Sequence, residues 1–209
     1  MVHSVTIRKE IADRVLQRRG RYHLFDRLDP VRTALVAIDM QNTFCAPGAP
    51  AEVPAARGIV EPINILTAGL RALRVPVIWV LHANERIGGK SDWELFFNTI
   101  VADEVRERTI ESLVPAKQSV WDGLLTSPAD RTVLKNRYSA LIPGSSPLER
   151  MLRGLGIDTI LIADQCVLRI NRTRCHDARL QGCAGRGLLR CSLRRRASQR
   201  LGKRHPAVW

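Results

Sequence analysis

Two charged residues that each end a short apolar run are the first candidates for chemistry. Asp39 follows residues 34–38, which read ALVAI, and Lys135 follows residues 132–134, which read TVL. Short apolar runs of this kind predict buried strands of a parallel sheet, and ligands bind at the carboxyl ends of such strands. Asp39 is therefore a candidate functional carboxylate, although the run alone equally allows an Asp that only caps a turn.

Further apolar runs and helical spacings surround these two residues. Buried strands are also expected at residues 75–81 and 159–163. Helices are expected at residues 7–19, 59–73, 91–100 and 147–155. The helix at 91–100 has Ser91 as its expected N-cap, with Glu94 at the capping-box position. Residues 42–57 contain three prolines and a glycine in a short stretch, which predicts a loop after the first strand.

The alternation of strands and helices predicts an α/β fold. The expected architecture is a doubly wound, Rossmann-like parallel sheet with helices on both faces. The right-handed crossover rule then places the carboxyl ends of the strands at one edge. Asp39 and Lys135 are expected at that edge.

The last part of the chain differs in composition from the rest. Residues 164–209 hold 12 Lys and Arg against 2 Asp and no Glu, whereas residues 1–163 hold 21 basic and 18 acidic residues. No apolar run of strand length follows Ala163, so the C-terminal part of the sheet is expected to be disrupted. We therefore divide the chain into an N-terminal extension (1–30), a domain (31–163) and a basic, disordered tail (164–209).

Composition also limits the setting in which the protein acts. No apolar run is long enough to span a bilayer, and residues 1–19 are too polar for a signal peptide, which predicts a cytoplasmic protein without a membrane partner. The five cysteines match no zinc-binding spacing. His82 is expected to be a polar residue at a strand end, because no D-x-H metal pattern accompanies it.

Three motifs together resemble one superfamily. They are residues 39–45 (DMQNTFC), residues 133–139 (VLKNRYS) and residues 148–157 (LERMLRGLGI). These resemble the isochorismatase-like cysteine hydrolases, which include nicotinamidases and the carbamoylsarcosine and ureidoacrylate amidohydrolases. The resemblance covers about residues 24–163, and the lysine motif is most similar to the ureidoacrylate and carbamoyl branch.

The resemblance implies an Asp-Lys-Cys triad that hydrolyses a C–N bond, amide or ureido, of a small-molecule substrate. Asp39 would take the thiol proton and Lys135 would favour the thiolate. The implied or candidate substrate-binding residues are Gln41, Phe44, Trp93, Trp121 and Tyr138, although core packing explains the two tryptophans equally well. The resemblance implies no cofactor and no metal, and relatives are commonly homo-oligomers.

The expected nucleophile is missing from the chain as written. In the family the strand before it is followed by a string like GTxTNVCCESTARDA, but residues 164–178 read DQCVLRINRTRCHDA. An alignment without gaps places Ile170 at the nucleophile position, and Ile cannot attack a carbonyl. Cys166 lies just past the strand and is the available stand-in nucleophile.

A change of reading frame explains the missing motif. Permitted codons for residues 165–184, read one base further on, encode SVCCESTARDAMMLGYKVV, which contains the family's nucleophile motif. The third bases were chosen to favour this result, but the first two bases of each codon are largely fixed. We therefore hypothesise that the tail from about Asp164 is a frameshifted reading of an isochorismatase-like gene.

Other interpretations stay open. The chain could be a Cys-less enzyme of the isochorismatase type, which hydrolyses a vinyl ether with Asp39 as general acid. It could be an inactive, truncated domain whose tail binds nucleic acid or another polyanion non-specifically through phosphate contacts at residues 194–196 and 203–204. It could also lack a stable fold, because the altered segment is larger than a marginally stable domain tolerates.

Overall fold

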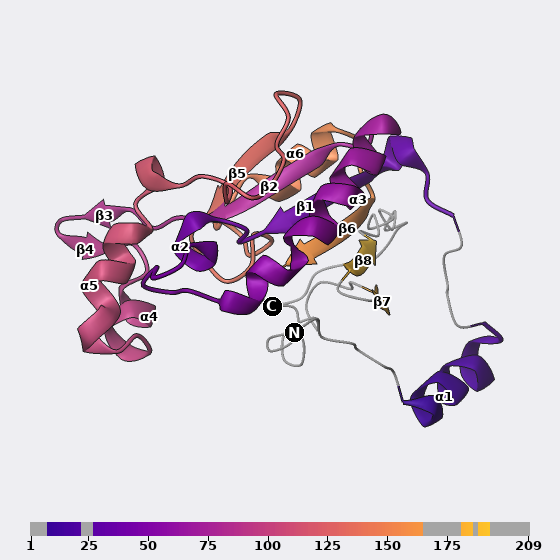
Figure 1. The fold of residues 1–209 in the computed structure, drawn as a ribbon, viewed down its shortest axis with the longest axis horizontal. Helices are drawn as coiled ribbons and strands as arrows, with labels where there is room; N and C mark the ends of the chain where they lie inside the picture. The colour runs from indigo at the N-terminus through magenta and orange to yellow at the C-terminus, as the bar shows by residue number, and fades with distance from the viewer. Residues whose placement is uncertain (1–7, 22–26, 165–180, 186–187, 193–209) are drawn as a thin grey trace, which may run out of the picture.

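A six-stranded sheet forms the centre of the protein (Figure 1). The structure is a computed structural model that describes residues 8–21, 27–164, 181–185 and 188–192. The strand order is β5-β2-β1-β6-β8-β7, and the first four strands are parallel. Their bounds are β1 Thr33–Ile38, β2 Val77–His82, β5 Arg131–Lys135, β6 Thr159–Asp164, β7 Gln181–Gly185 and β8 Leu188–Ser192.

The register brings the carboxyl ends of the four parallel strands level with one another. Ile38 of β1 lies opposite Val80 of β2 and opposite Asp164 of β6. His82 of β2 lies opposite Lys135 of β5. Asp39 and Lys135 therefore belong to the same edge of the sheet, as the sequence predicted.

Helices cover both faces of the parallel strands. Helix α3, Val60–Ala72, places Ile63 and Leu70 in a core cluster with one face of β1 and β2. Helix α6, Leu148–Gly154, places Leu148 and Leu152 in a second cluster on the opposite face. The predicted α/β class, with a parallel sheet between two helical layers, is confirmed.

Shorter elements connect these layers. They are α1 Lys9–Arg19, η1 Pro30–Arg32, α2 Asn42–Cys45, η2 Pro54–Ile59, β3 Arg86–Ile87, β4 Lys90–Ser91, α4 Glu94–Thr99, α5 Asp103–Ser112 and η3 Pro115–Lys117. The β3–β4 hairpin lies together with α4 and α5 at one end of the molecule (Figure 1). No helix among the described residues is both long and apolar enough to cross a membrane.

Two local predictions need correction. The helix expected from Ser91 begins at Glu94, with Trp93 as its N-cap residue, because Gly88 and Gly89 adopt positive φ angles and turn Ser91 back into pairing with Arg86. The segment 42–57, expected to be a loop, contains α2 and the start of η2. The carbonyl of Gln41 closes the single turn of α2 by accepting from the backbone N–H of Cys45 at 2.9 Å.

Two strands lie in the tail, although no apolar run of strand length predicted them; the disorder expected for the tail stays a prediction. β8 pairs antiparallel with β6, and β7 pairs antiparallel with β8. The physical reason is that β6 offers a row of backbone donors and acceptors on its outer side, and strand pairing satisfies them through main-chain atoms. The other residues of 165–209 lie outside the described part of the chain.

The packing of α6 gives a first prediction. Leu152 is 0% exposed in the cluster beneath β1 and β2, so Leu152→Ala should lower the free energy of unfolding by about 2–5 kcal/mol. Leu95, which is 79% exposed on α4, is the matched control. Leu95→Ala should change the free energy of unfolding by under about 0.5 kcal/mol. Urea unfolding measures both. Equal effects of the two substitutions would contradict the packing described for α6.

Candidate active site

Asp39 directly follows β1 in a backbone conformation that few residues adopt. Its φ angle is 58°, in the left-handed region, and its backbone N–H donates to the carbonyl of Val80 at 2.9 Å. A non-glycine residue there costs about 1–2 kcal/mol, although Asp tolerates it better than most. Backbone strain of this kind gathers at functional sites, and here it turns the carboxylate toward the neighbouring strands.

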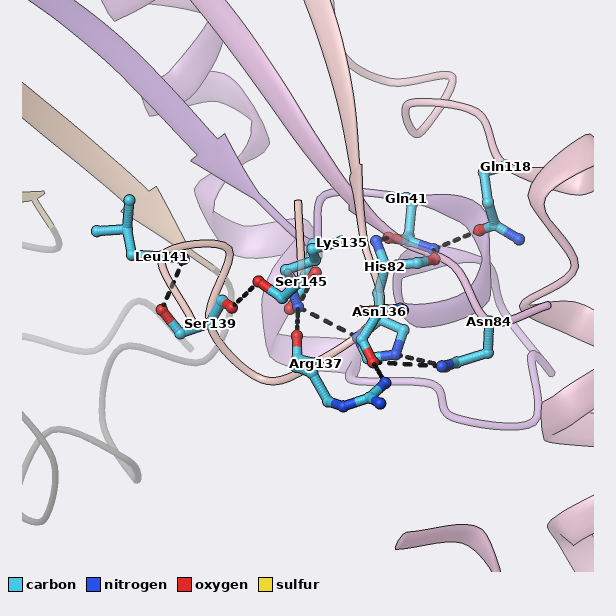
Figure 2. A network of polar contacts seen from close by, with 11 residues as sticks. Gln41, His82, Asn84, Gln118, Lys135, Asn136, Arg137, Ser139, Leu141 and Ser145 are labelled. Carbon is cyan, nitrogen blue, oxygen red and sulfur yellow. Dashed lines mark hydrogen bonds and ion pairs between the residues drawn. The ribbon is translucent and has the colours of Figure 1, made fainter. Parts of the chain in front are cut away.

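Lys135 ends β5 with its side chain only 1% exposed. Its Nζ lies 3.0 Å from Asp39 Oδ1, 3.2 Å from His82 Nδ1 and 3.3 Å from the carbonyl oxygen of Arg137 (Figure 2). The ammonium group can donate to His82 and to the carbonyl of Arg137, and its charge pairs with the carboxylate of Asp39. The geometry therefore suits a protonated lysine, even though the site is buried.

His82 connects this lysine to a second polar group. Its Nε2 lies 2.7 Å from Asn84 Oδ1, and its ring stacks on Trp93 at a centroid distance of 5.7 Å. Burial, and next the ammonium of Lys135, lower the pKa of His82 to about 3. His82 is thus a neutral imidazole at physiological pH and can accept a hydrogen bond from Lys135.

The carboxylate of Asp39 is the basic member of the site. Burial raises the pKa of Asp39 above its ordinary value, while the charge and hydrogen bond of Lys135 oppose that shift. A carboxylate with a raised pKa is a better proton acceptor, and the adjacent ammonium stabilises negative charge formed beside it. The pair can therefore remove a proton from a nucleophile and stabilise the resulting anion.

Gln41, which the sequence predicts to bind substrate, is buried and hydrogen-bonded at both ends of its amide. Its Nε2 donates to the carbonyl of His82 at 2.9 Å, and its Oε1 accepts from the N–H of His82 at 2.6 Å. Nε2 also donates to Gln118 Oε1 (Figure 2). Because both ends of this fully buried amide are engaged within the protein, Gln41 fastens the end of β2 rather than offering its amide to a substrate.

Three of the predicted aromatic residues gather around His82. Trp93 stacks between His82 and Phe96, with a centroid distance of 4.2 Å to Phe96. Tyr138 meets Trp93 edge-on at 4.8 Å, and Phe44 meets His82 edge-on at 6.5 Å. Tyr138 is half-exposed, so this aromatic group extends from the buried pair toward solvent.

Trp121 lies apart from this aromatic group. Its side chain packs against the core cluster that contains Trp79, and both line a hollow of about 520 Å³ beside Asp130. The backbone N–H of Trp121 donates to the carbonyl of Met40 at 2.9 Å. The core-packing interpretation of Trp121 is therefore the one that its contacts favour.

The structure describes Cys45, at the end of the DMQNTFC motif, but not Cys166, the expected stand-in nucleophile. Cys45 is buried, and burial raises the pKa of its thiol to about 11, so it remains protonated at neutral pH. Cys166 lies outside the described residues. Within those residues, no group of three His, Cys, Asp or Glu side chains is arranged to hold a metal. The expectation that the site needs no metal stays a prediction.

Sequence reasoning missed the polar residues that support His82. Asn84 and Asp92 were not singled out, and His82 was expected only to be a polar strand end. A signal was present, because polar residues at 82 and 84 alternate directly after a strand that is buried on both faces. Their partners, however, come from the β4–α4 connection and from the segment after β5, which no local pattern brings together.

A sequence model of the isochorismatase domain matches residues 33–169, about two thirds of the chain. The chain belongs to the isochorismatase family. The match begins with β1 and extends just past β6, so it contains Asp39, Lys135 and the whole network around His82.

Individual members of the isochorismatase family give the same assignment. A probable inactive nicotinamidase from Arabidopsis thaliana is 33% identical over 132 residues, which make up 63% of this chain and 64% of the relative. The ureidoacrylate amidohydrolase RutB of Methylobacterium radiotolerans is 28% identical over 148 residues, 64% of this chain and 56% of that protein. A cysteine hydrolase of solved structure from Pseudomonas syringae pv. phaseolicola is 26% identical, with a TM-score of 0.51, covering 66% of this chain and 61% of that one.

The similarity spans less than two thirds of each relative. Because the aligned stretch is almost the same fraction of this chain and of the Arabidopsis protein, the two chains have nearly equal lengths. The family match ends at Arg169, which is the first basic residue of the tail.

The contacts of Gln41 yield a second prediction. Gln41→Glu places a carboxylate against two acceptors, the carbonyl of His82 and Gln118 Oε1, and should lower the free energy of unfolding by about 2–4 kcal/mol at pH 7. Gln17→Glu on the exposed face of α1 is the control and should change it by under about 0.5 kcal/mol. Urea unfolding distinguishes them. A Gln41→Glu variant as stable as the control would rule out the proposed fastening of β2.

The neutral state of His82 yields a pH prediction. The unfolded chain binds a proton at His82 below pH 6.5, but the folded chain does so only near pH 3, so stability rises with pH across that window. Between pH 7.5 and pH 4.5 this group alone should remove about 2–3 kcal/mol of stability. The His82→Gln variant should be less stable than the unsubstituted chain at pH 7.5. On acidification to pH 4.5 its free energy of unfolding should fall by about 2–3 kcal/mol less than that of the unsubstituted chain. Urea unfolding at both pH values measures the difference. An identical pH dependence in both proteins would show that His82 titrates normally.

Proposed function

We propose that this chain carries the acid–base half of a cysteine-dependent hydrolase that cleaves a C–N bond, amide or ureido, of a small molecule. The observation that carries the proposal is the buried contact between Asp39 and Lys135 at the carboxyl ends of β1 and β5. The described residues contribute no competent thiol to this site, so the chain as written is proposed to be impaired. A cytoplasmic location and a homo-oligomeric state belong to the same proposal.

The proposed chemistry gives Asp39 and Lys135 separate roles. Asp39 takes the proton of a cysteine thiol while the thiolate attacks the carbonyl carbon, and Lys135 stabilises the thiolate as it forms. Collapse of the tetrahedral adduct breaks the C–N bond, and the leaving nitrogen takes the proton back from Asp39. Water then hydrolyses the thioester, again with Asp39 as general base, and releases the acid and the free thiol.

The position of the nucleophile supports the frame-change hypothesis. β6 ends at Asp164, which lies opposite Ile38, so the chain leaves the sheet beside Asp39. The shifted frame encodes its cysteine across codons 167 and 168, soon after this strand end. The family match also ends at residue 169, close to the position where the proposed change of reading frame begins.

One relative favours a second candidate. The Arabidopsis protein is described as a probable inactive nicotinamidase, so an isochorismatase fold without activity is a credible outcome for this chain as well. In that case the basic tail, with 12 Lys and Arg against 2 Asp, is proposed to bind polyanions such as RNA through phosphate contacts. Retention on RNA that falls steeply with salt and disappears when residues 165–209 are deleted would favour this candidate.

The test compares the chain as written with a version in which one base is skipped after codon 164. The restored protein should release ammonia from at least one of a ureido acid, a carbamoyl amino acid and nicotinamide. The chain as written should be slower by about 10³-fold or more, because a missing nucleophile removes the covalent path.

Variants of the restored protein test the roles of the charged pair. Asp39→Asn and Lys135→Met should each abolish most of the activity, whereas Lys117→Met, at an exposed lysine paired with Glu111, should not change it. A folded restored protein that hydrolyses none of the three substrates would contradict the proposal. Activity in the chain as written that is lost in Cys166→Ala would instead identify Cys166 as the nucleophile.

A further inference from the structure

We propose that Asn84 and Asp92 are positioning residues that hold His82 in its Nε2–H tautomer and thereby direct one N–H of Lys135 away from Asp39. The inference deepens the proposed function, because it concerns the support of the same Asp39–Lys135 pair. It rests on a chain of hydrogen bonds that runs from the β4–α4 connection to the end of β1.

The first step is the orientation of the Asn84 amide. Asn84 Nδ2 lies 2.6 Å from Asp92 Oδ1. It also lies 3.3 Å from the carbonyl oxygen of Asn136 (Figure 2). Both partners accept hydrogen bonds and donate none, so the nitrogen of the amide must face them. Asp92 is itself fixed, because its Oδ2 accepts from Asn136 Nδ2 at 2.9 Å and its carbonyl accepts from the Arg137 guanidinium at 3.1 Å. The oxygen of Asn84 therefore has only one direction available.

The second step is the tautomer of His82. Asn84 Oδ1 faces His82 Nε2 at 2.7 Å, and an amide oxygen can only accept, so Nε2 must carry the proton. In a neutral ring Nδ1 is then a bare lone pair. Nδ1 lies 3.2 Å from the Lys135 ammonium, which can only donate. Both neighbours of the ring thus require the same tautomer.

The third step concerns the charges that face the ring. Lys135 and the Arg137 guanidinium oppose protonation, the carboxylate of Asp92 favours it, and burial opposes it most strongly. Protonation at Nδ1 would point an N–H at the Lys135 ammonium across 3.2 Å. The stack of the ring on Trp93 prevents an easy reorientation that would relieve this conflict. The neutral form is therefore the one that the surroundings support.

The consequence for the reactive pair is a fixed ammonium. Lys135 gives one N–H to His82 and one to the carbonyl of Arg137, which holds its charge 3.0 Å from Asp39 Oδ1. If His82 adopted the other tautomer, Lys135 would lose an acceptor and gain a repelling N–H. Asn84 and Asp92 never touch Asp39, so they act on the pair only through His82.

The test is ¹⁵N NMR of the full chain labelled at histidine, in which ring-nitrogen shifts distinguish the two neutral tautomers from imidazolium. The His82 ring is assigned by its cross-relaxation with the Trp93 indole, which needs no substitution. We expect a neutral Nε2–H ring at pH 5, where a histidine with an ordinary pKa near 6.5 is already mostly protonated. A Nδ1–H ring, or titration of His82 near pH 6.5, overturns the proposal.

Substitutions test the role of the two positioning residues in the same spectrum. Asn84→Asp puts a carboxylate beside Nε2–H, so His82 should titrate at least two pH units higher. Asp92→Asn removes the fixed acceptor and should yield a mixture of tautomers. Asn98→Asp, on the exposed side of α4, is the matched control and should leave His82 unchanged. If both variants fold and the His82 spectrum is unchanged in each, the proposal is overturned. If neither variant folds, the tautomer and titration of His82 in the unsubstituted chain decide the proposal.

This measurement is independent of the nucleophile. An inactive restored protein whose His82 is the neutral Nε2–H form contradicts the proposed function and leaves the positioning role standing. An active restored protein with the opposite tautomer contradicts the positioning role alone. In an active protein, Asn84→Asp should also shift the pH profile of kcat/KM, a change that the Asn98→Asp control lacks.

Discussion

The buried ammonium of Lys135 is the constraint on which the rest of the site depends. Removing an ammonium group from water costs several kcal/mol unless its donors find acceptors in the protein. Here the acceptors come from three places: Asp39 after β1, His82 at the end of β2 and the backbone after β5. The strand order β5-β2-β1 makes this convergence possible, because it places these three strand ends side by side.

The same constraint explains why the surrounding residues are polar and fully engaged. A protonated His82 beside the lysine would add a second buried cation, so Asn84 and Asp92 hold the ring in a form that accepts. Gln41 fastens the backbone of the same histidine from the other side. The contacts described for the reactive pair thus come from residues that precede Asp164.

The parts that the sequence predicted well were those that depend on local apolar pattern. The four parallel strands, both helical layers and the shared edge of Asp39 and Lys135 follow from runs such as ALVAI and VPVIWVL. The start of α4 was missed because the hairpin turn at Gly88 and Gly89 outweighed the capping signal of Ser91. The hydrogen bonds of Gln41 to the backbone of His82 could not be predicted, because an amide that fastens a backbone and one that binds a substrate look alike in sequence.

The β7–β8 hairpin shows why a change of sequence can damage the site more than the sheet. Pairing at the edge of β6 uses main-chain donors and acceptors, which every residue except proline supplies in the same way, so a strand there makes few demands on side chains. The nucleophile position demands one particular side chain. A frame change after β6 would therefore leave the parallel strands and the Asp39–Lys135 pair intact while removing the thiol. Such a change of frame is consistent with a family match that covers residues 33–169.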